Sequence, residues 1–255
     1  MVTASFTHGY RPHPRLSANQ VADYLSASPT HRRRIISEAK YPTIVPVRYE
    51  DARSAVVRHL ANHNASSNVL SDALNSLQRK SDRSDLSAWK HKNHKLCAEA
   101  IAAFQEAESR MGLGGTHFKA PPGSIASKLK ISGVSISVSI DLLTQKPAGP
   151  GKHLIGGAVL VFSKTGGPDK NIGARCQAIA LLIHEFLKQY FGDKHDIDPT
   201  LCMAVDIFGG KAYRAKSQHK QLLKTIQISC EEVAVIWPSI KPPAKYFGPP
   251  IPSAA

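Results

Sequence analysis

The sequence predicts a mixed α/β protein, and three stretches in its second half carry that prediction. From residue 134 to residue 143, apolar and polar side chains alternate at first, as in a strand with one buried face. Residues 154–162 are apolar on both faces, which is typical of a central strand. Residues 171–191 have the spacing of a strong amphipathic helix. Strands and helices therefore follow one another in this part of the chain.

The N-terminal part is predicted to be a flexible tail at residues 1–15 and a helical region at residues 16–95. Ser17 is a candidate N-cap, because its hydroxyl can accept a hydrogen bond from a backbone N–H of the first helical turn. Pro29 suits the first turn of a second helix, since proline is tolerated there. A third helical pattern covers residues 49–60.

From residue 96 onward the predicted order is a helix, three strands, a helix, a strand and a helix. The expected bounds are 96–111, then 128–131, 134–143 and 154–162, then 171–191, 201–208 and 218–237. Residues 145–152 hold two prolines and two glycines and are expected to be a loop. Gly209 and Gly210 predict a tight turn after the last strand. Residues 96–238 should therefore form one domain, followed by a proline-rich tail at 239–255.

Charge is the strongest indication of a partner. Lys and Arg number 33 against 19 Asp and Glu, a net charge of +14. Such a surface attracts polyanions, so nucleic acid is the expected partner, with a protein partner also open. A basic surface that serves only solubility, or a membrane surface, is the competing interpretation. The phosphate-binding candidates are Arg32, Arg33, Arg34, Lys90, Lys92 and Lys95. Each run is equally consistent with a solvated helix face.

The expected compartment is the cytoplasm. No apolar run approaches the roughly 18 residues that a membrane span needs, and the first residues lack the apolar segment of a signal peptide. The four cysteines form no CxxC pair, so buried free thiols are expected, with a four-cysteine metal site as the alternative.

Residues in the second half carry a resemblance to a known family. Asp141 ends the segment ISGVSISVSID, the next predicted strand is HLIGGAVLVFSK, and Gln177 lies in the helix that follows. The fourth predicted strand is LCMAVDIFGGKAY. This order resembles the core of the PD-(D/E)XK nuclease superfamily, especially its RecB-like branch. There one strand ends near an Asp, the next carries (D/E)xK, and a helix, often with an early Gln, precedes another strand.

The resemblance implies a restriction-endonuclease-like core and metal-dependent hydrolysis of phosphodiesters. Two carboxylates would hold Mg²⁺ or Mn²⁺, which lowers the pKa of a bound water, while a Lys positions that water. Asp141 stands where the family has its first metal ligand. Lys164 and Glu185 are the remaining catalytic candidates, and Gln177 is a candidate for contacting nucleic acid.

The family's acid-x-Lys motif has no counterpart on the next strand. If residues 145–152 close a hairpin, Asp141 should lie opposite Gly156, and the motif should fall between Ala158 and Leu160. Neither of these side chains can bind a metal. Lys164 is farther along, roughly 26 Å from Gly156 at about 3.3 Å per residue. Three functions therefore stay open: a deoxyribonuclease with a rearranged site, an inactive relative that binds nucleic acid or a protein, and an accessory protein of a mobile element or defence system.

Overall fold

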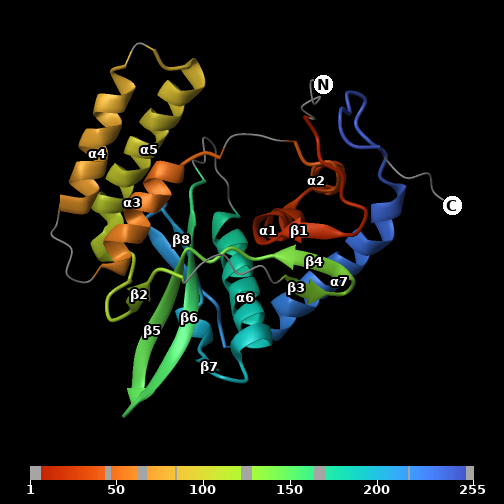
Figure 1. The fold of residues 1–255 in the computed structure, drawn as a ribbon. Helices are drawn as coiled ribbons and strands as arrows, with labels where there is room; N and C mark the ends of the chain where they lie inside the picture. Colours follow the sequence, from red (N-terminus) through yellow and green to blue (C-terminus); the bar gives the residue numbers. More distant parts are fainter. Residues whose placement is uncertain are drawn as a thin grey trace. The chain divides into compact units, whose positions relative to one another are not determined.

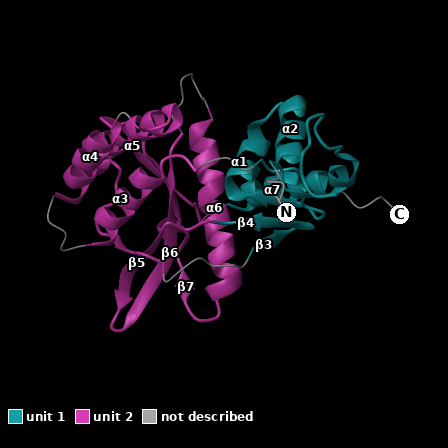
Figure 2. Ribbon diagram, turned by 45° about the horizontal axis from the view of Figure 1, so that its top comes forward, with its two compact units in different colours: residues 1–46, 126–138, 218–255 teal, residues 47–125, 139–217 magenta. Residues whose placement is uncertain are grey.

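The structure is a computed structural model that describes residues 7–43, 47–62, 68–83, 85–121, 128–163, 171–217 and 219–250. The fold is mixed α/β, as predicted (Figure 1). The chain forms two compact units, each assembled from segments that are far apart in the sequence (Figure 2). Unit 1 comprises Met1–Pro46, Ala126–Val138 and Gln218–Ala255, and unit 2 comprises Val47–Ile125 and Ser139–Ser217. The units thus interleave along the chain, whereas the expected division was into consecutive stretches.

Unit 1 combines a small sheet with three helices. Its sheet has the order β1 (Arg15–Ser17), β4 (Val134–Ser137) and β3 (Leu129–Ile131), with β1 parallel and β3 antiparallel to β4. The helices are α1 (Ala18–Ser26), α2 (Pro29–Lys40) and α7 (Lys220–Ile236), which is followed by the short helix η3 (Trp237–Ser239).

The predicted starts of the first two helices are confirmed. The Ser17 hydroxyl accepts a hydrogen bond from the Gln20 N–H, and the Gln20 side chain accepts one from the Ser17 N–H. This reciprocal pair satisfies two backbone donors at the first turn of α1. Pro29 is the first residue of α2, and the Ser28 hydroxyl caps that helix by accepting from the His31 N–H.

Unit 2 is built on a larger sheet with the order β2-β5-β6-β8-β9, and β7 pairs with β6. The strands are β2 (His117–Lys119), β5 (Leu142–Gly149), β6 (Lys152–Val161), β7 (Asp196–Ile197), β8 (Met203–Asp206) and β9 (Lys211–Arg214). Strand β5 runs antiparallel to β2 and β6, β8 runs parallel to β6, and β9 runs antiparallel to β8. The central position of β6 confirms the strand expected from its two apolar faces.

Helices cover both faces of this sheet (Figure 2). One face is covered by α3 (Glu50–Ala61) and α5 (Ala88–Ala107), against which α4 (Asn68–Ser81) packs, and the short helix η1 (Glu108–Arg110) follows α5. The opposite face packs on α6 (Ile172–Phe191), which connects β6 to β8; a short helix, η2 (Pro199–Leu201), precedes β8. The strand residues that are buried against these helices are Phe118, Leu142, Ala158, Leu160, Met203 and Val205.

The expectation of one strand over residues 134–143 was wrong. Strand β4 ends at Ser137 and pairs within unit 1, while β5 begins at Leu142 and pairs within unit 2. Strand β4 and the first half of β5 each have one buried face, so their alternation carries no signal of the change of sheet between them.

The expected loop at residues 145–152 was also wrong, and the error changes the register. Strand β5 continues to Gly149, so the hairpin closes more tightly, with an irregularity between Pro147 and Gly149. Strand β2 pairs with only the first part of β5, and proline is tolerated where a strand lies at an edge. Thr144 lies opposite Gly156, a position that had been expected for Asp141.

Candidate functional site

Asp141 lies just before β5, and hydrogen bonds tie it to the central strand β6. Its backbone N–H donates to the Ala158 carbonyl oxygen at 2.9 Å. Its carboxylate Oδ2 accepts from the Leu160 N–H at 2.7 Å. Only 12% of the side chain is exposed. The carboxylate is therefore fixed against the backbone of β6, which a residue in a flexible turn would not be.

Arg53, on α3, is the ionic partner of this carboxylate. Its Nη1 donates to Asp141 Oδ2. The guanidinium also lies over the ring of Phe162, 5.0 Å from the ring centroid, where a cation is attracted to the aromatic face. Arg53 is thus held by a carboxylate and by an aromatic ring.

Tyr49 supports this arrangement from the start of α3. Its ring stacks on Phe162 with centroids 5.2 Å apart and planes inclined by 15°. The backbone of Tyr49 is left-handed, with φ of 60°, which is unusual for a bulky residue. Its N–H donates to Asn93 Oδ1 at 3.3 Å, and Asn93 is buried on α5. The conformation that brings Tyr49 over Phe162 is therefore fixed by a neighbouring helix.

Two opposing effects act on the Asp141 carboxyl. Burial raises its pKa, because the charged form loses water, and this is the larger effect. The Arg53 guanidinium and the Leu160 N–H favour the charged form and offset part of that rise. The stability of the ionised carboxylate therefore depends on Arg53.

The residues around Asp141 do not fit the Mg²⁺ or Mn²⁺ site that the resemblance implies. Such ions take several oxygen ligands, with carboxylates prominent among them. Of the residues that the structure describes, only Arg53 and Leu160 bond to the Asp141 side chain. Within the same residues, Asp141 joins no group of three acidic, imidazole or thiol ligands. A metal ion would also be repelled by the guanidinium, which already holds the carboxylate oxygen.

The acid-x-Lys positions on β6 are apolar in the observed register too. Ala158 and Leu160 are the β6 residues bonded through their backbones to Asp141, and both side chains are buried in the core of unit 2. Phe162, two residues farther on, contacts Arg53. Neither an acid nor a lysine is therefore available on this strand beside Asp141.

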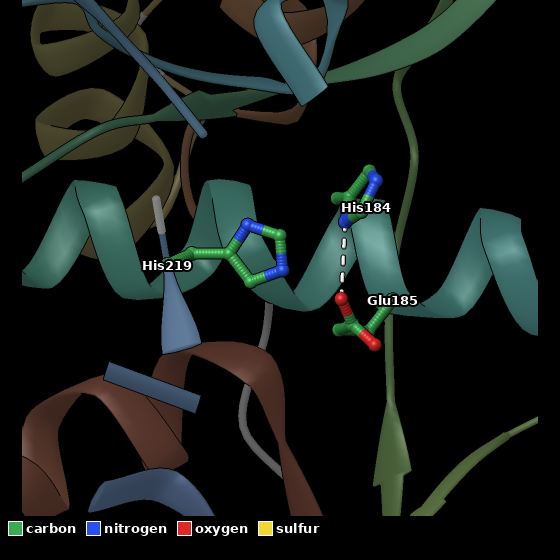
Figure 3. A group of neighbouring side chains, drawn as sticks. All are labelled: His184, Glu185 and His219. Carbon is green, nitrogen blue, oxygen red and sulfur yellow. Dashed lines mark hydrogen bonds and ion pairs between the residues drawn. The ribbon is translucent and has the colours of Figure 1, made fainter. Parts of the chain in front are cut away.

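Of the remaining candidates that the structure describes, Glu185 and Gln177 lie on α6, and neither bonds to Asp141. Glu185 lies on α6, where its Oε1 is 3.0 Å from Nδ1 of the buried His184 (Figure 3). Gln177 is half-buried on the same helix. Lys164 lies outside the described residues. The catalytic roles predicted for Glu185 and Lys164 stay predictions.

The first basic run, on α2 of unit 1, is only partly free for a ligand. Arg32 is half-buried, its Nη1 lies 3.3 Å from Glu232 Oε2, and its Nε donates to the Tyr24 carbonyl oxygen. Arg34 is exposed and lies 3.7 Å from Glu38. Arg33 is exposed. Arg33 and Arg34 are therefore the accessible members of this run.

The second basic run lies on α5 of unit 2, because that helix begins at Ala88 and not at residue 96 as expected. Lys90, Lys92 and Lys95 are all exposed. Lys92 and Lys95 border a hollow of about 960 Å³ between α4 and α5, together with His91 and His94. Lys92 and Lys95 thus border the same hollow, whereas Lys90 does not.

All four cysteines are buried and none forms a disulfide; they are Cys97, Cys176, Cys202 and Cys230. Burial raises the pKa of Cys202 and of Cys230 to about 12, so these thiols stay protonated at neutral pH. Buried thiols of this kind are inert to nucleophilic chemistry.

Arg53 is the site residue that the sequence did not indicate. It lies in the helix expected at residues 49–60, but it belongs to no motif and stands 88 positions before its partner Asp141. Only the folded arrangement joins the two.

Among the described residues, no helix is long and apolar enough to cross a membrane. No protein-family model matches the sequence, and no match to it is found among curated proteins.

Proposed function

We propose that this protein binds nucleic acid through a nuclease-like unit 2 that does not hydrolyse it. The order α5, β2, β5, β6, α6 and β8 supports the nuclease-like part of this proposal, since it is a helix, three strands, a helix and a strand. Strand β2 was not expected from the sequence, and it takes the place of the strand expected at residues 128–131, which belongs to unit 1. The closing helix expected at residues 218–237 is α7, which also belongs to unit 1. The restriction-endonuclease-like core therefore stays part of the proposal, with different strands.

One observation carries the inactive assignment: the carboxylate at the position of the first metal ligand is bonded to an arginine. Asp141 gives one oxygen to both Arg53 and the Leu160 N–H, and the neighbouring β6 side chains are apolar. Hydrolysis in this family needs an acid and a lysine beside that carboxylate. Their absence from β6 supports binding without cleavage over the active deoxyribonuclease.

The net charge of +14 supports nucleic acid as the partner. A positive surface attracts phosphates without reading base sequence, so binding should show little sequence preference. The accessible cations on α5 of unit 2 are the first candidates for these contacts, and those on α2 are additional candidates in unit 1; they are Lys90, Lys92 and Lys95, and Arg33 and Arg34.

The test is fluorescence anisotropy with labelled single-stranded and double-stranded 20-mers over a range of NaCl concentrations. We expect the binding constant to fall steeply with salt, with a log–log slope of about −0.9 for each phosphate neutralised on duplex DNA. Replacing Lys90, Lys92 and Lys95 by Ala should make that slope shallower. The matched control replaces Lys152, Lys188 and Lys194, which are exposed elsewhere on unit 2, and should change binding less.

Two results would overturn the proposal. Binding that does not respond to salt would exclude a phosphate-driven interaction. Degradation of linear or circular DNA that requires Mg²⁺ or Mn²⁺ and disappears in Asp141→Asn would establish the active deoxyribonuclease instead.

A further inference from the structure

We infer that Arg53 is a phosphate-binding group of unit 2 and supplies, without a metal ion, the cation of the nuclease-like site. This inference rests on the proposed function and deepens it, because it names one residue that contacts the nucleic-acid backbone. It gives Asp141 a positioning role, since that carboxylate orients Arg53.

The guanidinium of Arg53 has donors left for a ligand. An arginine carries five N–H donors, and Nη1 is the nitrogen that donates to Asp141. The Arg53 side chain is 37% exposed. Among the described residues, Asp141 is the one hydrogen-bond partner of the Arg53 side chain, and no Arg53 nitrogen is buried without a partner. Its remaining donors therefore reach solvent, where a phosphate oxygen can accept from two of them.

The conformation of Arg53 is fixed before any ligand arrives. Asp141 is itself bound to the backbone of β6, and Phe162 lies against the guanidinium face. A free arginine loses considerable rotamer freedom on binding, and an arginine already held in place loses less. A planar guanidinium also matches phosphate geometry with two parallel hydrogen bonds. Arg53 therefore combines charge, geometry and preorganisation.

Asp141 weakens the attraction of Arg53 for phosphate without abolishing it. The carboxylate is 12% exposed and lies behind the guanidinium, between Arg53 and the β6 backbone. A phosphate bound to the exposed donors would lie farther from Asp141 than from Arg53. Replacing Asp141 by Asn removes one like charge and keeps an oxygen that can accept from Arg53 and from Leu160.

The signs of these effects separate an arginine site from a metal site. If Arg53 binds phosphate, Asp141→Asn should bind about threefold more tightly, as expected for removing a like charge about 6 Å from a phosphate in water. If Asp141 holds a metal that binds phosphate, Asp141→Asn should lose binding, and EDTA should abolish binding by the wild type.

The experiment measures anisotropy of a labelled single-stranded 20-mer, once in EDTA and once in Mg²⁺. It compares wild type, Asp141→Asn, the double variant Asp141→Asn/Arg53→Met and the control Asp141→Asn/Arg58→Met. The Asn background avoids a buried unpaired carboxylate when Arg53 is removed. Arg58 lies on the same helix, is exposed, and bonds to the Ser54 carbonyl oxygen. Thermal melts followed by circular dichroism check that each variant is folded.

Relative to Asp141→Asn, the Arg53→Met double variant should bind roughly tenfold more weakly, the scale of losing a hydrogen bond to a charged group. Its log–log salt slope should be shallower by about 0.7, the single-strand value for one phosphate. The Arg58→Met control should change binding less. If the wild type binds and the Arg53→Met double variant matches Asp141→Asn within about twofold, this inference fails and the proposed function stands. If the wild type binds in Mg²⁺ but not in EDTA, a metal holds the phosphate and this inference fails. If the wild type binds in neither, the proposed function itself fails.

Discussion

The two units contain the same three-part arrangement with different burial. In unit 2, Arg53 contacts the Phe162 ring and the Asp141 carboxylate. In unit 1, Arg32 lies over the Tyr24 ring, 4.9 Å from its centroid, and pairs with Glu232. The two arginines are similarly exposed, 37% and 31%, but Asp141 is 12% exposed and Glu232 is 41% exposed.

The difference in the carboxylates decides what each pair does. An exposed pair such as Arg32–Glu232 contributes little, because water solvates both charges when the pair is broken. A buried carboxylate that loses its cation stays in a medium that cannot solvate it. The Arg53–Asp141 pair should therefore matter for stability, and its arginine is held more firmly.

The largest expected effect is that of Arg53→Met on stability. Removing the cation leaves the Asp141 charge buried, which typically costs about 3 kcal/mol or more. Urea unfolding at neutral pH measures this loss. Asp141→Asn alone should change the free energy of unfolding by less than about 1 kcal/mol, and adding it to Arg53→Met should recover most of the loss. A double variant as unstable as Arg53→Met would show that packing on Phe162, and not the charge, is what Arg53 contributes.

A second prediction concerns pH. The folded-state pKa of Asp141 is raised above its ordinary value of 3.8, so between these two values the folded chain binds more protons than the unfolded chain. The contribution of Asp141 to the free energy of unfolding should therefore fall as pH rises through that window. In unfolding titrations, the stability of Asp141→Asn relative to wild type should increase from pH 3.8 upward. A relative stability that decreases instead would mean that Arg53 outweighs burial.

The third prediction tests the exposed half of the comparison. Arg32→Met should lower the free energy of unfolding by less than about 1 kcal/mol, because Glu232 is accessible to water once the pair is broken. Urea unfolding at neutral pH measures this loss, which is compared with the loss caused by Arg53→Met. A loss equal to that of Arg53→Met would remove the distinction between the two pairs.

The smallest expected effect concerns the thiols. All four cysteines are buried, and burial raises the pKa of Cys202 and Cys230 to about 12. In the native protein at neutral pH, none should react with a thiol reagent within the time in which all four react in urea. Mass spectrometry after alkylation counts the labelled thiols. Rapid native labelling of Cys202 would contradict the packing of unit 2, and that of Cys230 the packing of unit 1.

Local patterns in the sequence predicted local structure. The Ser17 cap, the start of α2 at Pro29 and the central strand β6 depend on neighbouring residues, and all three are confirmed. The break between β4 and β5 was not predictable, because the pleat has the same period in either sheet. The register of β5 on β6 was missed because two prolines suggested a loop where a strand continues.

The candidate site was predictable in part for a similar reason. The resemblance singled out Asp141 and showed that acid-x-Lys is missing from the next strand. It gave no indication of Arg53, whose contact with Asp141 exists only in the folded chain. Arg32 had been a phosphate-binding candidate, yet its Nη1 pairs with Glu232 and its Nε donates to the Tyr24 carbonyl oxygen. A run of like charges therefore did not reveal which members are already paired.

The central claim is that an arginine, and not a metal ion, neutralises Asp141. Electron paramagnetic resonance of free Mn²⁺ tests it directly, because the six-line signal weakens when the ion binds. If Arg53 neutralises Asp141, we expect wild type and Asp141→Asn to take up the same amount of Mn²⁺ at each concentration. One additional Mn²⁺ per chain in the wild type, absent from Asp141→Asn, would contradict this claim and place a metal at Asp141.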